Sequence, residues 1–296
     1  MLTETGSAYC LDLGDGLNAR WSTAADTESI AHLIGMVFRE KADELENVRM
    51  ANSVRRMMRG DYPLMGPNDY ALIEDTRKEG NPIAACTCLW RQTWEYEGIP
   101  FEIGRPEFVA TDPNYRRRGL IRVLFDMVHR RSADEGHPVT AITGIPYFYR
   151  QFGYEYALDL DGKRKTYLTQ IPKTKDGEPE LYTLREATIE DIPLIQASYN
   201  HRRAGSIVWT RIPDSYWRYE FEAWRIQPEW GRTSNTQIIV DSTGLPQGYV
   251  LLAPIRWGSS LPVWGFETTP GTNLRAMLPS VLRAQDIWRT DTHIEA

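Results

Sequence analysis

The chain has 296 residues, which is typical of two domains. Hydrophobic residues make up 42% and charged residues 25%, which is enough apolar material for packed cores. The net charge of −6 argues against a nucleic-acid backbone as the main partner.

Several other classes of protein are also disfavoured. No apolar run reaches the roughly 20 residues that a membrane helix needs, and the N-terminus lacks the basic and apolar regions of a secretion signal. Cys86 and Cys88 lie two residues apart in a strand-like run, and no second pair completes a metal site. We therefore expect a cytoplasmic protein without a metal, in which these cysteines are small buried side chains.

The first half alternates between the helical and the strand period of apolar residues. In chain order we expect a strand at 19–23, a helix that includes 30–38, a helix at 47–59, strands at 70–74, 83–95 and 99–111, a helix at 119–135, a strand at 139–142 and a short helix at 147–151. This order predicts an α/β (α+β) fold, with a mixed central sheet flanked by helices.

The opening pattern of the chain returns 165 residues later. Arg20, Thr23 and Asp26 precede the first helix, and Arg185, Thr188 and Asp191 precede a later one. Strand-like runs at 237–240 and 249–253 also repeat the hairpin of the first half. We predict two related domains, 1–165 and 180–296, joined by a polar stretch at 161–180 that starts as a strand; chance similarity is the alternative.

One segment, 108–121, carries the features of a diphosphate site. A strand ends, Pro113 turns the chain, and Arg116–Arg118 and Gly119 open an amphipathic helix. Free N–H groups at a helix start bind anions, glycine lets the backbone approach them closely, and arginines supply charge. The alternative is a solvated arginine cluster, but cations are unfavourable at that end of a helix unless an anion binds there.

The run Arg116-x-x-Gly119-x-Ile121 resembles the R/Q-x-x-G-x-G/A signature of GNAT N-acetyltransferases. Three arginines followed by Gly-Leu are similar to the enhanced-intracellular-survival branch, whose members acetylate amines such as aminoglycosides or lysine side chains. The resemblance implies a GNAT fold and acetyl-CoA as the co-substrate. Ile121 departs from the pattern and is expected to crowd the phosphates. The coenzyme-binding residues that the resemblance implies are Phe108, Val109, Ala110, Thr111, Arg116, Arg117, Arg118, Gly119, Leu120 and Ile121.

A second match is the run from Tyr147 to Tyr154, which resembles the Y-x-x-x-G-F/Y segment of the same superfamily. The resemblance makes Tyr149 the general acid that protonates the departing coenzyme A thiolate. A phenol with a pKa near 10 is protonated at neutral pH and suits that role. The alternative is a tyrosine that only packs among its aromatic neighbours.

The implied mechanism is direct attack of an amine on a thioester carbonyl polarised by backbone N–H groups near 109–111. A base must take a proton from the amine, and Glu102 and Glu107 on the adjoining strand are candidates. Arg105 occupies the position where the superfamily commonly has a glutamate, which weakens the prediction of a carboxylate base. The C-terminal carboxylate that serves as base in the enhanced-intracellular-survival branch comes from a third domain and cannot be carried over.

The second half has no arginine–glycine loop at 264–275 and no tyrosine segment after it. We predict a degenerate or truncated GNAT-like domain that binds no coenzyme. Its aromatic residues either line a substrate cleft or pack in a core; they are Trp209, Tyr216, Trp217 and Trp224.

These patterns together predict an N-acetyltransferase that moves an acetyl group from acetyl-CoA to a primary amine of a small molecule or a protein. A non-catalytic acyl-CoA-binding or regulatory module, and an interaction protein that uses the Trp-rich second half, are the alternatives. Neither a nucleic acid nor a membrane is expected as a partner, and relatives in the branch form oligomers, so a homo-oligomer is one expectation. The identity of the amine and the acyl length stay open.

Overall fold

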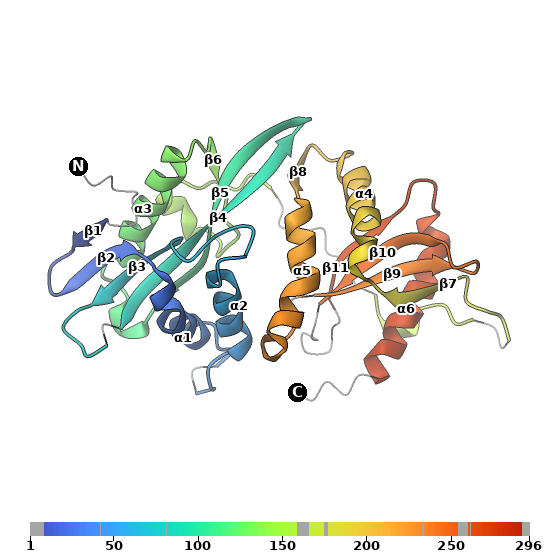
Figure 1. Cartoon of the computed structure of the whole chain (residues 1–296), viewed down its shortest axis with the longest axis horizontal. Helices are drawn as coiled ribbons and strands as arrows, with labels where there is room; N and C mark the ends of the chain where they lie inside the picture. Colours follow the sequence, from blue (N-terminus) through green and yellow to red (C-terminus); the bar gives the residue numbers. More distant parts are fainter. Residues whose placement is uncertain are drawn as a thin grey trace. The chain divides into compact units, whose positions relative to one another are not determined.

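The structure is a computed structural model that describes residues 9–41, 43–80, 82–158, 166–174, 177–232, 234–253, 260 and 262–291. The chain divides into two compact units, Met1–Leu160 and Asp161–Ala296. In each unit helices cover both faces of a sheet (Figure 1). The strand predicted at the start of the 161–180 stretch lies outside the described residues.

Unit 1 has the predicted alternation of helices and strands. Its elements are β1 (Cys10–Asp12), β2 (Leu17–Trp21), η1 (Ala24–Asp26), α1 (Thr27–Val37), α2 (Val48–Met58), β3 (Tyr70–Asp75), β4 (Ile83–Tyr96), β5 (Ile99–Thr111), η2 (Pro113–Tyr115), α3 (Leu120–Asp134), β6 (Val139–Thr140) and η3 (Tyr149–Phe152). The strands lie in the order β1-β2-β3-β4-β5-β6; neighbours up to β5 are antiparallel, and β6 is parallel to β5. The expected mixed α/β fold is confirmed.

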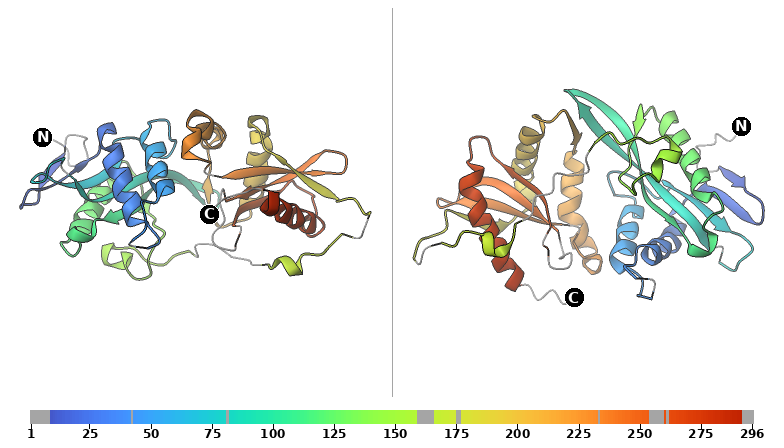
Figure 2. Two further views of the ribbon diagram at one scale, coloured as in Figure 1. Left: turned by 90° about the horizontal axis from the view of Figure 1, so that it is seen from below. Right: turned by 180° about the vertical axis from the view of Figure 1, so that it is seen from behind.

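Different helices cover the two faces of this sheet (Figure 2). Residues alternate between the faces, so Cys86 and Cys88 pack in the core under α1 and α2, whereas Ala85 and Leu89 pack in the core under α3. Both cysteines are fully buried, as predicted. Burying one large aliphatic side chain in such a core stabilises the fold by about 1.5–3 kcal/mol.

Four charged side chains tie the C-terminal end of α3 to the sheet. Asp69 accepts hydrogen bonds from Arg91 at 2.8 and 3.0 Å, and its carboxylate also lies 2.8 Å from Arg131. Glu135 accepts from Arg91 at 2.7 Å and from Arg131 at 3.1 Å. Asp69 is only 6% exposed, so removing it would leave the two arginines to share the single carboxylate of Glu135.

Unit 2 repeats the layered plan with fewer strands. Its elements are η4 (Leu168–Gln170), β7 (Tyr182–Glu186), η5 (Ile189–Asp191), α4 (Ile192–Arg203), β8 (Val208–Arg211), α5 (Asp214–Ile226), η6 (Pro228–Trp230), β9 (Asn235–Asp241), β10 (Pro246–Leu252), β11 (Val263–Thr268) and α6 (Leu274–Asp291). The strands β11-β10-β9-β7 form an antiparallel sheet; α4 and α5 pack on one face and α6 on the other.

The repeated opening pattern makes the same contacts in both units. Arg20 holds Asp26 through two hydrogen bonds of 2.9 and 2.8 Å, and Arg185 holds Asp191 through two of 2.7 Å. In each unit the aspartate also accepts from the backbone of the threonine that caps the helical turn. Trp217 is 4% exposed and packs in the core of unit 2, while the side chain of Trp224 lies outside the described residues.

Candidate functional site

Strand β5 contains a β-bulge at 108–109. Cys86 of β4 pairs with Ala110, and Cys88 pairs with Glu107, so one residue of β4 faces two residues of β5. Because of the extra residue, Glu107 and Ala110 both lie on the face of the sheet that α1 and α2 cover.

Contacts from β4 hold the bulge in place. The backbone carbonyl of Glu107 accepts a hydrogen bond from the Thr87 hydroxyl at 2.9 Å and one from the Cys88 thiol at 3.4 Å. Phe108 has a φ of 52°, an unusual conformation for a bulky residue. Strained backbone of this kind is concentrated at functional sites, where the surrounding structure maintains it.

Beyond its first half, β5 separates from β6. The two strands pair only at Ile103 with Val139 and at Gly104 with Thr140. Pro106, which follows, has no N–H group and could not extend the pairing, as is usual for proline at a strand edge. The second half of β5 therefore has an open edge opposite β4.

The open edge presents backbone donors. The N–H of Asp112 points to β4, where it donates to the Ala84 carbonyl at 2.9 Å. Backbone groups of an antiparallel strand alternate in direction, so the N–H of Thr111 points away from β4. An extended ligand could pair with it as a neighbouring strand would.

The loop after β5, at the start of α3, has the backbone features expected of an anion site. Gly119 has a φ of 74° and Arg117 one of 64°, and in the described structure the backbone N–H groups of 117–121 have no hydrogen-bond acceptor. Arg116–Arg118 are exposed and form no ion pair with any described residue. Free N–H groups, the positive end of a helix dipole and unpaired guanidinium groups together fit a pyrophosphate.

The side chains at the helix start turn into the core. Leu120 is 5% exposed, and both it and Ile121 pack in the core that α3 covers. These two residues can therefore offer backbone N–H groups to a ligand, and the crowding expected from Ile121 is reduced.

The tyrosine segment packs directly on the first turns of α3. The guanidinium of Arg122 lies 5.3 Å from the ring centre of Phe152, and the ring of Phe125 stacks on Phe152 at 4.7 Å. Gly153 ends the short helix η3 with a φ of 91°. These contacts place Phe152 of the tyrosine segment against the first turns of α3, which follow the arginine loop.

Tyr149 lies between α3 and the backbone of the preceding loop. Its ring is 5.7 Å from that of Phe125, and a Cβ added at Gly144 would overlap the ring, so the glycine permits the approach. Burial raises the pKa of the Tyr149 phenol, and the charge of Glu107 raises it further. The phenol is thus protonated at neutral pH and lies within the electrostatic range of Glu107.

The two candidate bases lie on opposite faces of β5. Burial raises the pKa of the Glu107 carboxyl, although its ion pair with Arg105 opposes the shift. Glu102 is exposed and accepts a hydrogen bond from Thr93 at 2.8 Å on the α3 side of the sheet. The structure therefore places Glu107 at the bulge, on the face of the sheet that α1 and α2 cover, and it does not bring Glu102 there. Sequence reasoning noticed Arg105 but missed that it pairs with Glu107, two positions along the same strand face.

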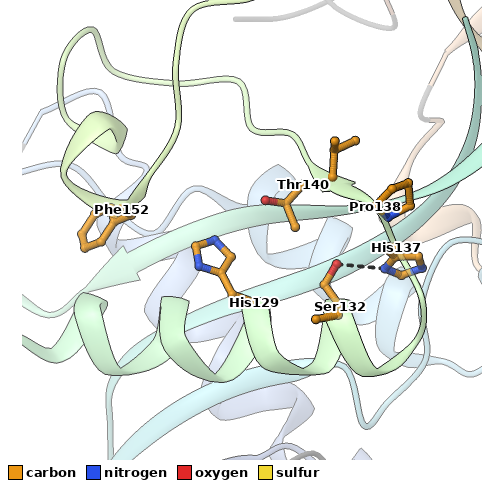
Figure 3. A pocket seen from close by; sticks show the side chains of 8 residues that line it. His129, Ser132, His137, Pro138, Thr140 and Phe152 are labelled. Atoms are coloured by element: carbon orange, nitrogen blue, oxygen red, sulfur yellow. Dashed lines mark hydrogen bonds between the residues drawn. The ribbon is translucent and has the colours of Figure 1, made fainter.

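A separate pocket of about 290 Å³ lies beside the C-terminal half of α3 (Figure 3). Its polar groups already have partners: the imidazole of His129 is 2.8 Å from the Tyr154 hydroxyl, and Ser132 Oγ is 2.9 Å from the imidazole of His137. Burial lowers the pKa of both imidazoles. His129 is ten residues beyond Gly119, about 15 Å along the helix axis. We therefore treat this pocket as distinct from the arginine loop.

No helix in the described part of the chain is long and apolar enough to cross a membrane. Within the same residues no three His, Cys, Asp or Glu side chains gather in a way that could hold a metal ion.

Known proteins are similar in sequence to one region of this chain and similar in fold over most of its length. A 70-residue region is 43% identical to the N-acetyltransferase Eis of Mycobacterium bovis (strain BCG / Pasteur 1173P2) and to that of Mycobacterium tuberculosis (strain ATCC 25177 / H37Ra). The match spans 21% of this chain and only 17% of each relative.

Solved structures show the same fold at low sequence identity. A conserved protein of unknown function from Enterococcus faecalis V583, described as a probable N-acyltransferase, is 15% identical with a TM-score of 0.59. A GCN5-related N-acetyltransferase from Kribbella flavida is 16% identical with a TM-score of 0.56. The likeness covers 90% and 92% of this chain but 62% of each of the two structures.

Residues 18–157 match the model of the acetyltransferase (GNAT) domain. This range contains the bulged strand β5, the arginine loop and the tyrosine segment that the fold brings together. Unit 1 of the chain is therefore a GNAT acetyltransferase domain.

Proposed function

We propose that the protein is an acetyl-CoA-dependent N-acetyltransferase that acts on a primary amine. One observation carries the proposal: the open edge of β5 leads directly into the Arg116–Gly119 loop, so a single segment can hold an extended arm and a pyrophosphate. Coenzyme A has both parts. Bound acetyl-CoA would supply an activated acetyl thioester.

Backbone N–H groups and two side chains of unit 1 are proposed to serve the transfer. The N–H groups of 109–111 polarise the thioester carbonyl, as donors fixed in advance do in other acyl transfers. Glu107 takes a proton from the amine as its nitrogen forms the new C–N bond. Tyr149 gives its phenolic proton to the sulfur when the C–S bond breaks.

The proposal is tested by incubating the purified protein with acetyl-CoA and a panel of amines. We expect thiol release that depends on the amine, together with an acetylated amine detected by mass spectrometry. Binding of acetyl-CoA without any acetylated product would contradict catalysis. It would favour the second candidate, a non-catalytic acyl-CoA-binding module, for which the Arg105 guanidinium held on Glu107 is the supporting observation.

The pH profile should identify the base. A base must be deprotonated, and the raised pKa of Glu107 keeps its inactive acid form populated to a higher pH than the ordinary value near 4.3. We therefore expect kcat/KM to fall on acidification along a limb centred above that value. Glu107→Gln should remove the limb and lower the rate about 100-fold. Glu102→Gln is the matched control and should leave the profile unchanged; a limb that persists in Glu107→Gln would exclude Glu107 as the base.

We further propose that unit 2 is a second, degenerate GNAT-like domain that binds no coenzyme. The corresponding helix, α6, already has its first N–H groups occupied, because Asn273 Oδ1 accepts from Arg275 at 3.0 Å and from Ala276 at 3.3 Å. The repeated arginine–aspartate pair supports a common origin of the two units. A second equivalent of bound acetyl-CoA would contradict this proposal.

A further inference from the structure

A compact group of side chains adjoins the bulge on the face of the β4–β5 hairpin that α1 and α2 cover. Trp90 is paired directly with Arg105, and Gln92 lies two residues further along β4. Glu107 follows Arg105 on the same face of β5. The proposed base thus belongs to a wider polar and aromatic surface.

Arg105 makes three contacts in this group, but one of its nitrogens has no hydrogen-bond partner. It forms an ion pair with Glu107, donates to the Gln92 side chain at 3.2 Å and lies 5.9 Å from the ring centre of Trp90. Its Nε–H is buried without an acceptor, and so is the indole N–H of Trp90 opposite it. A buried unpaired donor costs about 1–3 kcal/mol, so two of them together favour binding of an oxygen-bearing group.

Aromatic rings adjoin these donors. Phe38, Tyr62, Trp90 and Phe108 form what we name the aromatic cluster, with neighbouring ring centres 6.1–6.4 Å apart. Phe38 is 39% exposed at the end of α1, so part of the cluster is accessible. Rings at this spacing suit an aromatic or aliphatic side chain of a ligand.

The ion pair restricts which amine can use Glu107. For an amine to reach this carboxylate, Arg105 has to move away, and a half-buried guanidinium without a counter-charge is unfavourable. An acceptor that has its own carboxylate can replace Glu107 as the ion-pair partner of Arg105. Its ammonium group pairs with Glu107 while its carboxylate pairs with Arg105, so the number of ion pairs is conserved.

We propose that the acyl acceptor is an amino acid, or an amino-acid derivative that keeps its carboxylate, with an aromatic or aliphatic side chain. Arg105 and the Trp90 indole bind the carboxylate, and the aromatic cluster contacts the side chain. This inference rests on the proposed acetyltransferase activity and assigns its substrate class. A polycationic amine has no group for Arg105 and would place further positive charge beside it.

The test compares acceptors that differ in one feature. Acetyl transfer from acetyl-CoA is measured with phenylalanine, with 2-phenylethylamine, which lacks the carboxylate, and with the polyamine spermidine. We expect kcat/KM for phenylalanine to exceed that for 2-phenylethylamine about 10- to 100-fold, the worth of one charged hydrogen-bonded contact. Arg105→Gln should abolish this preference, measured as the ratio of the two kcat/KM values, because the change at Glu107 affects both acceptors and only phenylalanine loses a carboxylate contact. Arg105→Lys keeps the positive charge but loses the planar pair of guanidinium donors, so it should retain part of the preference for phenylalanine. The matched control is Arg218→Gln, which removes an exposed, ion-paired arginine of unit 2 and should change neither rate.

The outcomes separate this inference from the function on which it rests. Equal or faster acetylation of 2-phenylethylamine or spermidine by the wild-type protein would overturn the amino-acid assignment and leave the acetyltransferase activity intact. This comparison needs no variant, so a variant that fails to fold cannot obscure it. If no acceptor is acetylated, the assignment fails. Titration of the same sample with acetyl-CoA then decides whether coenzyme binding fails as well.

Discussion

Tyr149→Phe is expected to lower kcat by about 100- to 1,000-fold and to leave acetyl-CoA affinity unchanged. The substitution removes only the phenolic proton donor, and general acid catalysis contributes about 10²- to 10⁴-fold. The remaining ring still packs against Phe125 and Phe148, so the fold should be preserved. Steady-state kinetics and coenzyme titration of the same preparation measure the two effects separately.

A neighbouring tyrosine provides the control. Tyr147 is 73% exposed and makes an edge contact with Tyr156, so Tyr147→Phe should not change kcat. Equal rates for Tyr149→Phe and the wild-type protein would exclude Tyr149 as the general acid. A parallel loss of coenzyme affinity would instead assign the tyrosine to binding.

Asp69→Ala is expected to destabilise unit 1 by about 3 kcal/mol, because it removes the more buried of the two carboxylates that Arg91 and Arg131 share and leaves only Glu135 between them. For a unit of this size that loss lowers Tm by roughly 6–12 °C. The C-terminal end of α3 would loosen, and α3 carries the arginine loop at its other end. Thermal unfolding followed by circular dichroism measures the change.

An exposed ion pair in the same unit is the matched comparison. Glu155 pairs with Arg150 at 3.1 Å, and both side chains are more than half exposed. Glu155→Ala should therefore cost less than about 1 kcal/mol. Similar losses for the two variants would show that burial does not set the strength of the Asp69 network.

Much of the fold could be predicted from local patterns of apolar and turn-forming residues in the sequence. The apolar spacing at 120–134 and the strand pair joined at Glu97-Gly98 match elements of the structure closely, because amphipathic helices and tight hairpins are encoded by nearby residues. Helix α5 was not predicted, and β6 is only two residues long where four were expected. The open edge of β5, a consequence of that short pairing, depends on long-range contacts that periodicity does not reveal.

The sequence motifs of the candidate site could be recognised in advance, but the contacts between its residues could not. The arginine loop and Tyr149 lie in continuous segments and could be recognised directly. The bulge, which sets the face of the sheet on which Glu107 lies, depends on register with β4, and sequence alone does not fix that register. Two signals were available: Pro106 inside a strand indicates an open edge, and the apolar run at 108–110 breaks the alternation of β5. The same alternation would have placed Glu102 and Glu107 on opposite faces.

Calorimetric titration with acetyl-CoA tests the central claim most directly. We predict micromolar binding at one site per chain, and affinity at least about 100-fold weaker when Arg116→Ala and Arg118→Ala are combined, since each guanidinium is expected to make a charged contact worth about 1.5–3 kcal/mol. The double variant should have a Tm close to that of the wild-type protein, because neither side chain forms an ion pair with a described residue and the hydrogen bond from Arg118 to the Asn114 carbonyl is exposed. No binding by the wild-type protein, or unchanged affinity in the double variant, would contradict the assignment of this loop as the coenzyme site.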